Sequence, residues 1–345
     1  NGSMNGPLLV KDVEIPESLM GPLNALHEAA GGMYYYGESD YNPYFLVSSG
    51  LKAYNGMYEP HADDDIKELY WNFFIKKEIK TAQDLGAQIG IYDVHAYPGQ
   101  YEVRSGAYAE KLRRIRAEVP AGKKLIFGEA GYKYSAPEDS LLKAEYDRRV
   151  VGHPFTKGSD CNMLCYDYFY GLDMPLLAME VMNNGLSGVA AWMLDDAMHS
   201  NGDSGRTEDV KIWGMWNILG EEVFGDASQE ELRPWYYTWS LMCRCFPAGC
   251  DILACEVPQR DGVRVAAARK DAAYSVAAVN FSQEPCTLEI VLPGDFAGGV
   301  LYRYTESDRA CDERGLPVPC ERGIAGRSFR TTLPAESFVL LTNIE

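Results

Sequence analysis

Hydrophobic and polar residues follow two alternating patterns along residues 1–246. One set of segments has apolar residues at helical spacing, and short apolar runs typical of buried strands follow these segments. The predicted helices cover residues 17–31, 66–86, 108–122 and 173–185, and the predicted strands cover 44–51, 87–99, 123–131 and 186–196. One helical face of residues 108–122 is apolar and consists of Tyr108, Leu112, Ile115 and Val119. A repeated order of helix, short loop and buried strand predicts parallel βα units and an α/β fold.

The pattern changes after an amphipathic segment at residues 232–246. Residues 263–281 have the pattern of two strands joined at Lys270 and Asp271. Further strand-like segments follow at residues 286–294, 300–306 and 337–343. This succession predicts an all-β module, most simply a β-sandwich. We therefore expect two domains, at residues 1–246 and 250–345.

Composition and charge exclude some classes of partner. The chain has 345 residues, is 46% hydrophobic, and carries a formal net charge of −18. An acidic surface repels phosphate backbones and anionic lipids, so we expect no nucleic-acid partner. No apolar run reaches the roughly 18 residues of a membrane span, so we expect none. The 23 tyrosines and 6 tryptophans fit a neutral, hydroxylated ligand, although most such side chains pack in cores.

The cysteines and histidines do not form a recognisable metal-binding pattern. All nine cysteines lie from Cys161 onward, and the group from Cys243 to Cys255 lacks the paired C-x-x-C spacing of a zinc site. The five histidines are scattered and form no H-x-x-x-H pair. We expect no metal and no other cofactor. Ordinary buried thiols and an isolated disulfide both remain open for the cysteines.

Polar and aromatic residues stand at the ends of three predicted strands. Residues 87–99 carry Asp93, His95 and Tyr97, residues 123–131 carry Glu129, and residues 186–196 carry Trp192, Asp195 and Asp196. The carboxyl ends of parallel strands form the active face of α/β folds, so these side chains should converge on one rim. A doubly wound sheet usually also shows a glycine-rich phosphate loop near its first strand, and we find none.

The order of these motifs resembles a known clan of enzymes. His-x-Tyr at 95–97, strand-Gly-Glu-x-Gly at 128–131 and Gly-x-x-Gly-Val-x-x-Trp at 185–192 resemble strands six, seven and eight of the retaining (β/α)₈ glycoside hydrolases. Residues 264–282 and 333–342 resemble the β-sandwich that follows the barrel in several of its families. The resemblance covers roughly residues 40–345 and implies a (β/α)₈ TIM barrel followed by a β-sandwich.

The resemblance also implies roles for individual residues. Glu129 would be the nucleophile that forms a glycosyl-enzyme, and hydrolysis would retain the anomeric configuration. The enzyme would act in carbohydrate metabolism or polysaccharide degradation. Trp192 would be the platform beneath the sugar, and His95 and Tyr97 would keep Glu129 ionised and oriented. Asp196 or Tyr132 would bind sugar hydroxyls. The competing interpretations are a solvated strand-end glutamate, a core tryptophan, a buried histidine and a solvated loop carboxylate.

The sequence departs from the clan at the general acid/base. That residue is a glutamate in an Asn-Glu pair at the end of strand four, and no Asn-Glu occurs in this chain. An eight-unit barrel needs about 250 residues, yet the segment resembling strand eight already ends near Trp192. Only strands five to eight are recognisable, so we expect the polypeptide to extend upstream of Asn1 and supply the first strands with the acid/base. Glu38 is the weaker candidate within the chain.

The sequence therefore predicts a retaining glycoside hydrolase that acts on an oligo- or polysaccharide. The resemblance further suggests a secreted, periplasmic or cell-surface protein. Two alternatives remain: a non-catalytic carbohydrate-binding protein on a glycosidase-like barrel, and a structural protein that uses the barrel as scaffold, since fold does not fix function. Retention needs two carboxyl groups roughly 5–5.5 Å apart, whereas a binding protein needs neither.

Overall fold

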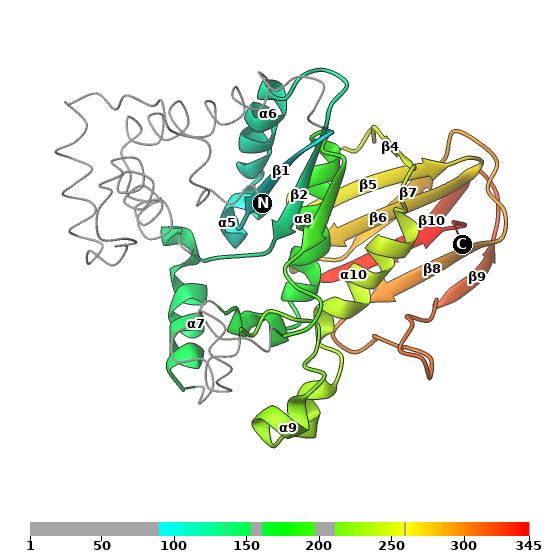
Figure 1. The fold of residues 1–345 in the computed structure, drawn as a ribbon. Helices are drawn as coiled ribbons and strands as arrows, with labels where there is room; N and C mark the ends of the chain where they lie inside the picture. The colour runs from blue at the N-terminus through cyan, green and yellow to red at the C-terminus, as the bar shows by residue number, and fades with distance from the viewer. Residues whose placement is uncertain (1–89, 135, 153–160, 197–210, 259, 345) are drawn as a thin grey trace, which may run out of the picture.

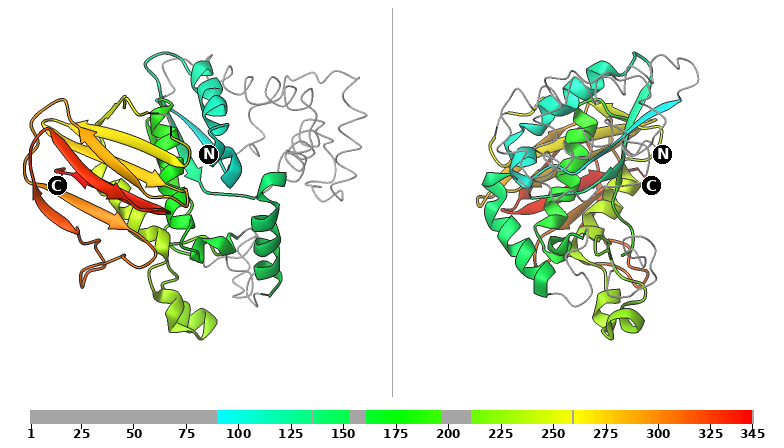
Figure 2. Two further views of the ribbon diagram at one scale, coloured as in Figure 1. Left: turned by 180° about the vertical axis from the view of Figure 1, so that it is seen from behind. Right: turned by 60° about the vertical axis from the view of Figure 1, so that its left-hand side comes forward.

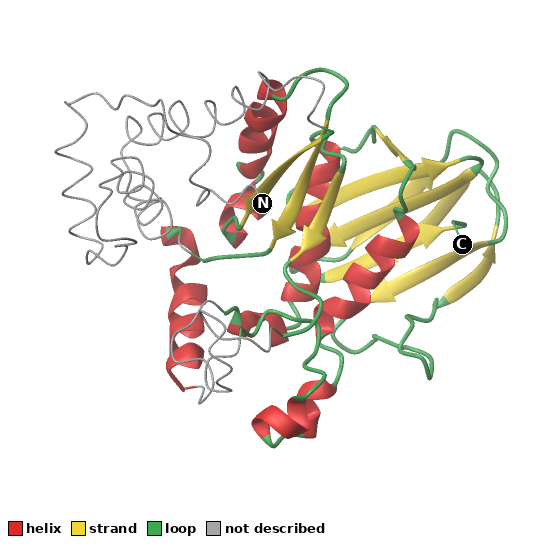
Figure 3. Cartoon of the chain, in the orientation of Figure 1, coloured by secondary structure: helices red, strands yellow, loops and turns green. Residues whose placement is uncertain are grey.

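A computed structural model describes residues 90–134, 136–152, 161–196, 211–258 and 260–344. Their strands form a parallel sheet and an antiparallel region of two sheets, and helix α8 lies between the parallel sheet and the larger antiparallel sheet (Figures 1 and 3). Three predicted elements, at residues 17–31, 44–51 and 66–86, lie outside the described residues, as does Glu38.

The parallel sheet contains β1 (Ile91–Ala96), β2 (Lys124–Ala130) and β3 (Gly188–Ala191), in that order. Between β1 and β2 lie α5 (Gln100–Ser105) and α6 (Tyr108–Glu118). Between β2 and β3 lie η4 (Pro137–Asp139), α7 (Ser140–Gly152), η5 (Met163–Tyr166) and α8 (Tyr170–Asn183). Parallel pairing of successive strands across helices confirms the predicted βα order. The closed eight-stranded barrel stays a prediction, because the parallel sheet of the described residues has three strands.

The apolar face predicted for residues 108–122 is the face that α6 buries. Tyr108 and Leu112 are buried, and Ile115 packs against the same core. The helix ends at Glu118 instead of continuing to Gly122. Val119 precedes Pro120, and a residue before proline is disfavoured in helical conformation. Val119 accordingly has extended dihedral angles, and its side chain is still buried.

Helix α8 contacts both sheets and packs along α10 (Pro234–Cys245) (Figure 2). It contains Pro175, which has no N–H and therefore leaves the carbonyl of Gly171 without its usual intrahelical donor. The hydroxyl of Thr238 on α10 donates to that carbonyl at 2.7 Å. A polar group that the proline frees is thus satisfied by the neighbouring helix, which fixes the two helices relative to each other.

The antiparallel group begins with β4 (Asp251–Leu253), β5 (Val263–Lys270) and β6 (Ala273–Asn280). A sheet with order β4-β5-β6-β11-β8-β9 is completed by β8 (Gly299–Tyr304), β9 (Glu321–Ile324) and β11 (Ser337–Thr342). The hairpin predicted at Lys270 and Asp271 is confirmed, since β5 ends at Lys270 and β6 begins at Ala273. Asp271 has φ of 54°, in the left-handed region that aspartate tolerates in such turns.

Both faces of the central strands β6 and β11 are covered. Phe338 and Leu340 face the core shared with the helices and the parallel sheet. Val339 and Leu341 face a second core, which also contains residues of β7 (Cys286–Val291) and β10 (Ser328–Leu333). Strands β7 and β10 form a separate two-stranded antiparallel sheet. The region consists of strands as predicted, and they pair antiparallel, whereas the sandwich and the boundary between residues 246 and 250 stay predictions.

Two short elements extend from the body of the molecule below α10 (Figure 1). They are α9 (Gly220–Phe224) and η7 (Ala227–Glu230). In the described part of the chain, no helix combines the length and apolarity needed to cross a membrane.

Leu340→Ala should lower the free energy of unfolding by about 2–5 kcal/mol, because it leaves a cavity in a fully buried site. Chemical denaturation followed by tryptophan fluorescence measures the change. Val291→Ala is the control, since Val291 is 71% exposed on β7 and its truncation removes little buried surface. Equal midpoints for the two variants would contradict the assignment of Leu340 to the shared core.

Candidate active site

Glu129 lies opposite His95 in the register of β2 with β1. The Tyr97 hydroxyl donates to one carboxylate oxygen, Oε1. Nδ1 of His95 lies 2.8 Å from the other, Oε2. The Glu129 side chain is 23% exposed, so it is held from two sides and still open to solvent.

Gly131 leaves room for the aromatic rings beside this carboxylate. A Cβ at position 131 would lie 3.0 Å from the Trp213 ring and 3.1 Å from the Tyr97 ring. The two rings meet edge to face, with centroids 5.2 Å apart and an interplanar angle of 66°. Lys133 Nζ lies 4.8 Å from the Tyr97 ring centroid. Tyr97 is thus packed by its neighbours in the orientation that brings its hydroxyl to Glu129.

Trp192 directly follows β3 at the same end of the sheet. Its backbone N–H donates to the Ala130 carbonyl at 2.8 Å, which places it beside the residue after Glu129. The side chain is half-buried against the main core, and the peptide bond between Trp192 and Met193 is cis. The structure therefore brings together His95, Tyr97, Glu129 and Trp192 at the carboxyl ends of adjacent parallel strands. A shared sugar pocket stays a prediction.

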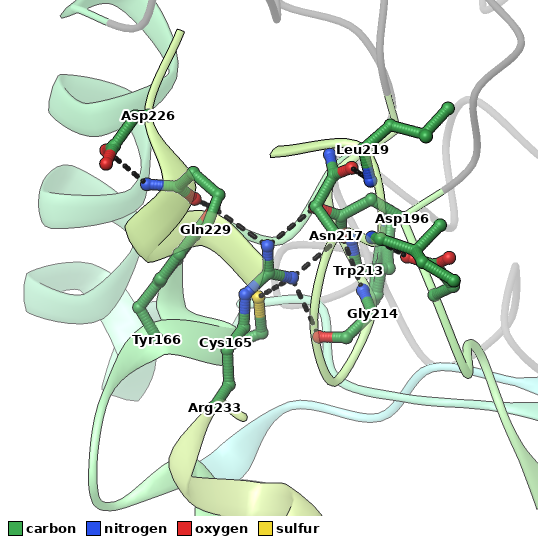
Figure 4. Close-up of polar contacts among 12 residues, drawn as sticks. Cys165, Tyr166, Asp196, Trp213, Gly214, Asn217, Leu219, Asp226, Gln229 and Arg233 are labelled. Atoms are coloured by element: carbon green, nitrogen blue, oxygen red, sulfur yellow. Dashed lines mark hydrogen bonds and ion pairs between the residues drawn. The ribbon is translucent and has the colours of Figure 1, made fainter. Parts of the chain in front are cut away.

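Asp196 is not the exposed sugar ligand that the sequence suggested. Its carboxylate is fully buried and forms a two-pronged ion pair with Arg233, at 2.6 and 2.7 Å (Figure 4). One of its oxygens also accepts the backbone N–H groups of Trp213 and Gly214, at 3.0 and 2.8 Å. With its partners all inside the protein, Asp196 has a structural role. It holds Trp213, which in turn packs on Tyr97.

The neighbouring Asp195 helps to hold the same segment. Its carboxylate accepts the N–H of Ile218 at 3.1 Å. Arg233 also donates to the Gly214 carbonyl at 2.8 Å and to the Tyr166 hydroxyl at 2.9 Å (Figure 4). Residues 213–218 are therefore fixed to the end of β3 by several independent bonds. Arg233 and Trp213 were not identified from the sequence, because their partners lie many residues away along the chain.

Tyr132 also has a different place from the one expected. Its side chain is 1% exposed, and its hydroxyl donates to the Asp173 backbone carbonyl on α8 at 2.7 Å. Burial raises the pKa of Tyr132 well above its ordinary value, so the phenol stays neutral. A buried hydroxyl with an internal partner is not available to a sugar, and the role of Tyr132 is to join β2 to α8.

A second buried ion pair lies behind the sheet. The Asp173 carboxylate accepts from Arg104 Nε at 2.8 Å and from Gln100 Nε2 at 2.6 Å, which ties α5 to α8. Burial raises the pKa of Asp173, and the Arg104 charge opposes that shift. Asp173 is fully buried and already paired, so we assign it no chemistry.

The cysteines are free thiols, which removes the disulfide alternative. Burial raises the pKa of Cys165 to about 12, so this thiol is protonated and unreactive at neutral pH. Among the residues that the structure describes, no group of three or more histidine, cysteine, aspartate or glutamate side chains is arranged to hold a metal ion.

No protein-family model matches the sequence, and no curated protein matches it. Among solved structures the chain is similar to a glycoside hydrolase family 30 subfamily 8 xylanase from Clostridium acetobutylicum, at 13% identity over 94% of this chain and 92% of that one, with a TM-score of 0.40. It is similar to a GH39 β-xylosidase from Caulobacter crescentus, at 13% identity over 94% of this chain and 72% of that one, with a TM-score of 0.43. It is also similar to a GH51 α-L-arabinofuranosidase from Thermotoga petrophila RKU-1, at 13% identity over 89% of this chain and 65% of that one, with a TM-score of 0.44.

These three structures belong to the enzyme class that the strand motifs resemble. Identities of 13% and TM-scores of 0.40–0.44 carry no argument about the activity of this chain. The functional inference therefore rests on the side chains around Glu129.

Asp196→Asn should destabilise the protein by about 3–5 kcal/mol, because it leaves the Arg233 charge buried without its anionic partner. Thermal unfolding followed by circular dichroism measures the loss. Asp295→Asn is the matched control, since Asp295 forms an ion pair with Arg327 but is 92% exposed, and its melting temperature should not change. A wild-type melting temperature for Asp196→Asn would show that Asp196 is not the structural residue described here.

Proposed function

We propose that the protein is a retaining glycoside hydrolase in which Glu129 is the nucleophile. The observation that carries this proposal is the arrangement of Glu129, one of whose carboxylate oxygens accepts a hydrogen bond from Tyr97 while the other lies 2.8 Å from Nδ1 of His95. Contacts to both oxygens hold the carboxylate in one orientation. An oriented and partly exposed carboxylate at the carboxyl ends of parallel strands is suited to attack a bound substrate.

The proposed reaction has two displacements at the anomeric carbon. In the first, a Glu129 oxygen bonds to that carbon, and the glycosidic oxygen leaves with the bonding electrons and takes a proton from a general acid. In the second, water attacks the same carbon, loses a proton to the same group, and frees the Glu129 carboxylate. The hydrogen bond from Tyr97 stabilises the carboxylate that departs in this second step, and His95 lies beside its other oxygen.

Trp192 supplies the second part of the proposal. It follows the strand next to Glu129 and is half-buried, so part of its ring is open to a ligand. Sugar CH groups stack on aromatic faces, and we assign Trp192 as the platform for the sugar beside Glu129. The substrate class that fits these groups is a neutral oligo- or polysaccharide, in keeping with the acidic chain and the expected secreted, periplasmic or cell-surface location.

Retention also requires a proton donor on a second carboxyl group, roughly 5–5.5 Å from the nucleophile. Glu38 lies outside the described residues. Its assignment, and the rival expectation of a donor upstream of Asn1, both stay predictions. The test of the nucleophile must therefore work without an acid catalyst.

A glycoside with an activated leaving group meets that requirement. A panel of 2,4-dinitrophenyl 2-deoxy-2-fluoroglycosides would be incubated with the protein, because dinitrophenolate leaves without protonation and the fluorine slows release of the glycosyl-enzyme. Peptide mass spectrometry should find one added fluoroglycosyl group on Glu129. Labelling of another residue would assign the nucleophile elsewhere. Saccharide binding without labelling or turnover would favour the non-catalytic carbohydrate-binding protein.

Glu129→Gln should fold normally and lower turnover of a dinitrophenyl glycoside by several orders of magnitude, because the amide has the same shape but does not attack the anomeric carbon. Initial rates and circular dichroism together test this expectation. The exposed Glu138→Gln serves as the control and should keep the wild-type rate. Wild-type hydrolysis by Glu129→Gln would mean that another residue attacks.

Tyr97→Phe should reduce kcat by roughly 10- to 100-fold, as expected for a hydrogen bond to a charged group worth about 1.5–3 kcal/mol. The ring and its packing on Trp213 remain, so the melting temperature should change little. Steady-state kinetics on the same substrate give the comparison. An unchanged kcat would show that the Tyr97 hydroxyl does not support the reactive carboxylate.

A further inference from the structure

The pairing of β1 with β2 contains a β-bulge directly before Glu129. Val94 pairs with Phe127, but the next residue of β1, His95, pairs with Glu129, so Gly128 is an extra residue in β2. In a regular register His95 would face Gly128, and Glu129 would point to the opposite side of the sheet. The bulge is therefore what puts Glu129 on the same side as His95.

The extra residue needs an acceptor for its backbone N–H, since a bulge interrupts the regular ladder of hydrogen bonds. Asp93 supplies that acceptor, with Oδ1 at 2.7 Å from the Gly128 nitrogen. The approach is close, because a Cβ at position 128 would lie 2.5 Å from each Asp93 carboxylate oxygen and would displace the carboxylate. Gly128 and Asp93 thus fit each other as a pair.

The other oxygen of Asp93 is near the second ring nitrogen of His95. Oδ2 lies 3.7 Å from Nε2, within the range of an ion pair, while Nδ1 of the same ring contacts Glu129. One carboxylate therefore contacts both the bulge that orients Glu129 and the imidazole that holds it. The Asp93 side chain is 44% exposed, so burial alone does not explain its position.

We propose that Asp93 is a positioning residue for Glu129. By accepting the Gly128 N–H it fixes the bulge, and the bulge sets Glu129 opposite His95. This inference rests on the proposed function for its effect on turnover, but the position of Glu129 can be measured without any activity.

The kinetic test compares two substitutions at one position. Asp93→Ala removes the acceptor and should lower kcat on a dinitrophenyl glycoside by roughly 10- to 100-fold, with KM changed less than about 3-fold, as expected for a misplaced reactive group. Asp93→Asn keeps an oxygen that can accept the Gly128 N–H and should retain most of the wild-type kcat. Equal losses in the two variants, or no loss in Asp93→Ala, would overturn the proposal.

A matched control is available in the antiparallel region. The Asp312 carboxylate also accepts backbone N–H groups, from Arg314 and Leu316 at 2.9 and 3.0 Å. Asp312→Ala therefore removes the same kind of bond in another region of the fold, and kcat should stay at the wild-type value. A parallel fall in kcat for Asp312→Ala would mean that the loss reflects general destabilisation, which would count against a positioning role.

The crystal structure of Asp93→Ala provides the readout that is independent of turnover. The contact between His95 Nδ1 and Glu129 Oε2, 2.8 Å in the wild type, should lengthen beyond hydrogen-bonding distance. An unchanged contact would overturn the proposal even if glycosidase activity is found. If the wild type hydrolyses no glycoside and no glycoside labels it, the proposed function fails. The distance between His95 and Glu129 still tests the role of Asp93 in that case. Should Asp93→Ala not fold, Gly128→Ala, which displaces the Asp93 carboxylate, is expected to give the same lengthening, and an unchanged contact there would overturn the proposal.

Discussion

A carboxylate at the end of a buried strand must either be solvated or find hydrogen-bond donors, and Glu129 has both. Its donor Tyr97 and its close neighbour His95 come from the end of the neighbouring strand. Tyr97 is held in place by the Trp213 ring, and Trp213 is held through its backbone by Asp196. The contacts around one partly exposed carboxylate thus continue inward to a fully buried ion pair.

The charged groups of this region divide into two kinds by their surroundings. Asp196 with Arg233 and Asp173 with Arg104 are pairs in which each carboxylate is fully enclosed and bonded to protein groups. Such pairs contribute more to a defined geometry than to net stability, because their desolvation offsets much of their attraction. Glu129 differs because its contacts with Tyr97 and His95 leave part of the carboxylate open to solvent. Burial and pairing, more than residue type, separate the structural carboxylates from the candidate reactive one.

The same distinction explains which parts of the structure were predictable from the sequence. Helices α6, α8 and α10 and the hairpin at Asp271 have regular periodicity or turn chemistry, both of which are local signals. Strands β4, β9 and β10 were missed, since β4 has only three residues and most residues of β9 and β10 are polar. Asp196 and Tyr132 were placed correctly near strand ends but given the wrong role. Their partners, Arg233 and Asp173, are 37 and 41 residues away, and no local pattern specifies such contacts.

The alternation of core-facing residues along β2 is interrupted by the bulge at Gly128. Leu125 and Phe127 face the core, so strict alternation along β2 would send Glu129 into the core as well. Burying an unpaired carboxylate there would be prohibitive. The observed strand instead has Ala130 in the core and Glu129 beside His95, which requires the strand to slip by one residue between Phe127 and Glu129. Gly128 permits that slip, and the Asp93 carboxylate accepts the N–H that the slip leaves unpaired. A charged residue at a position that alternation assigns to the core, directly after a glycine, is therefore a sequence signal for a bulge, and here the bulge determines which side of the sheet the candidate nucleophile faces.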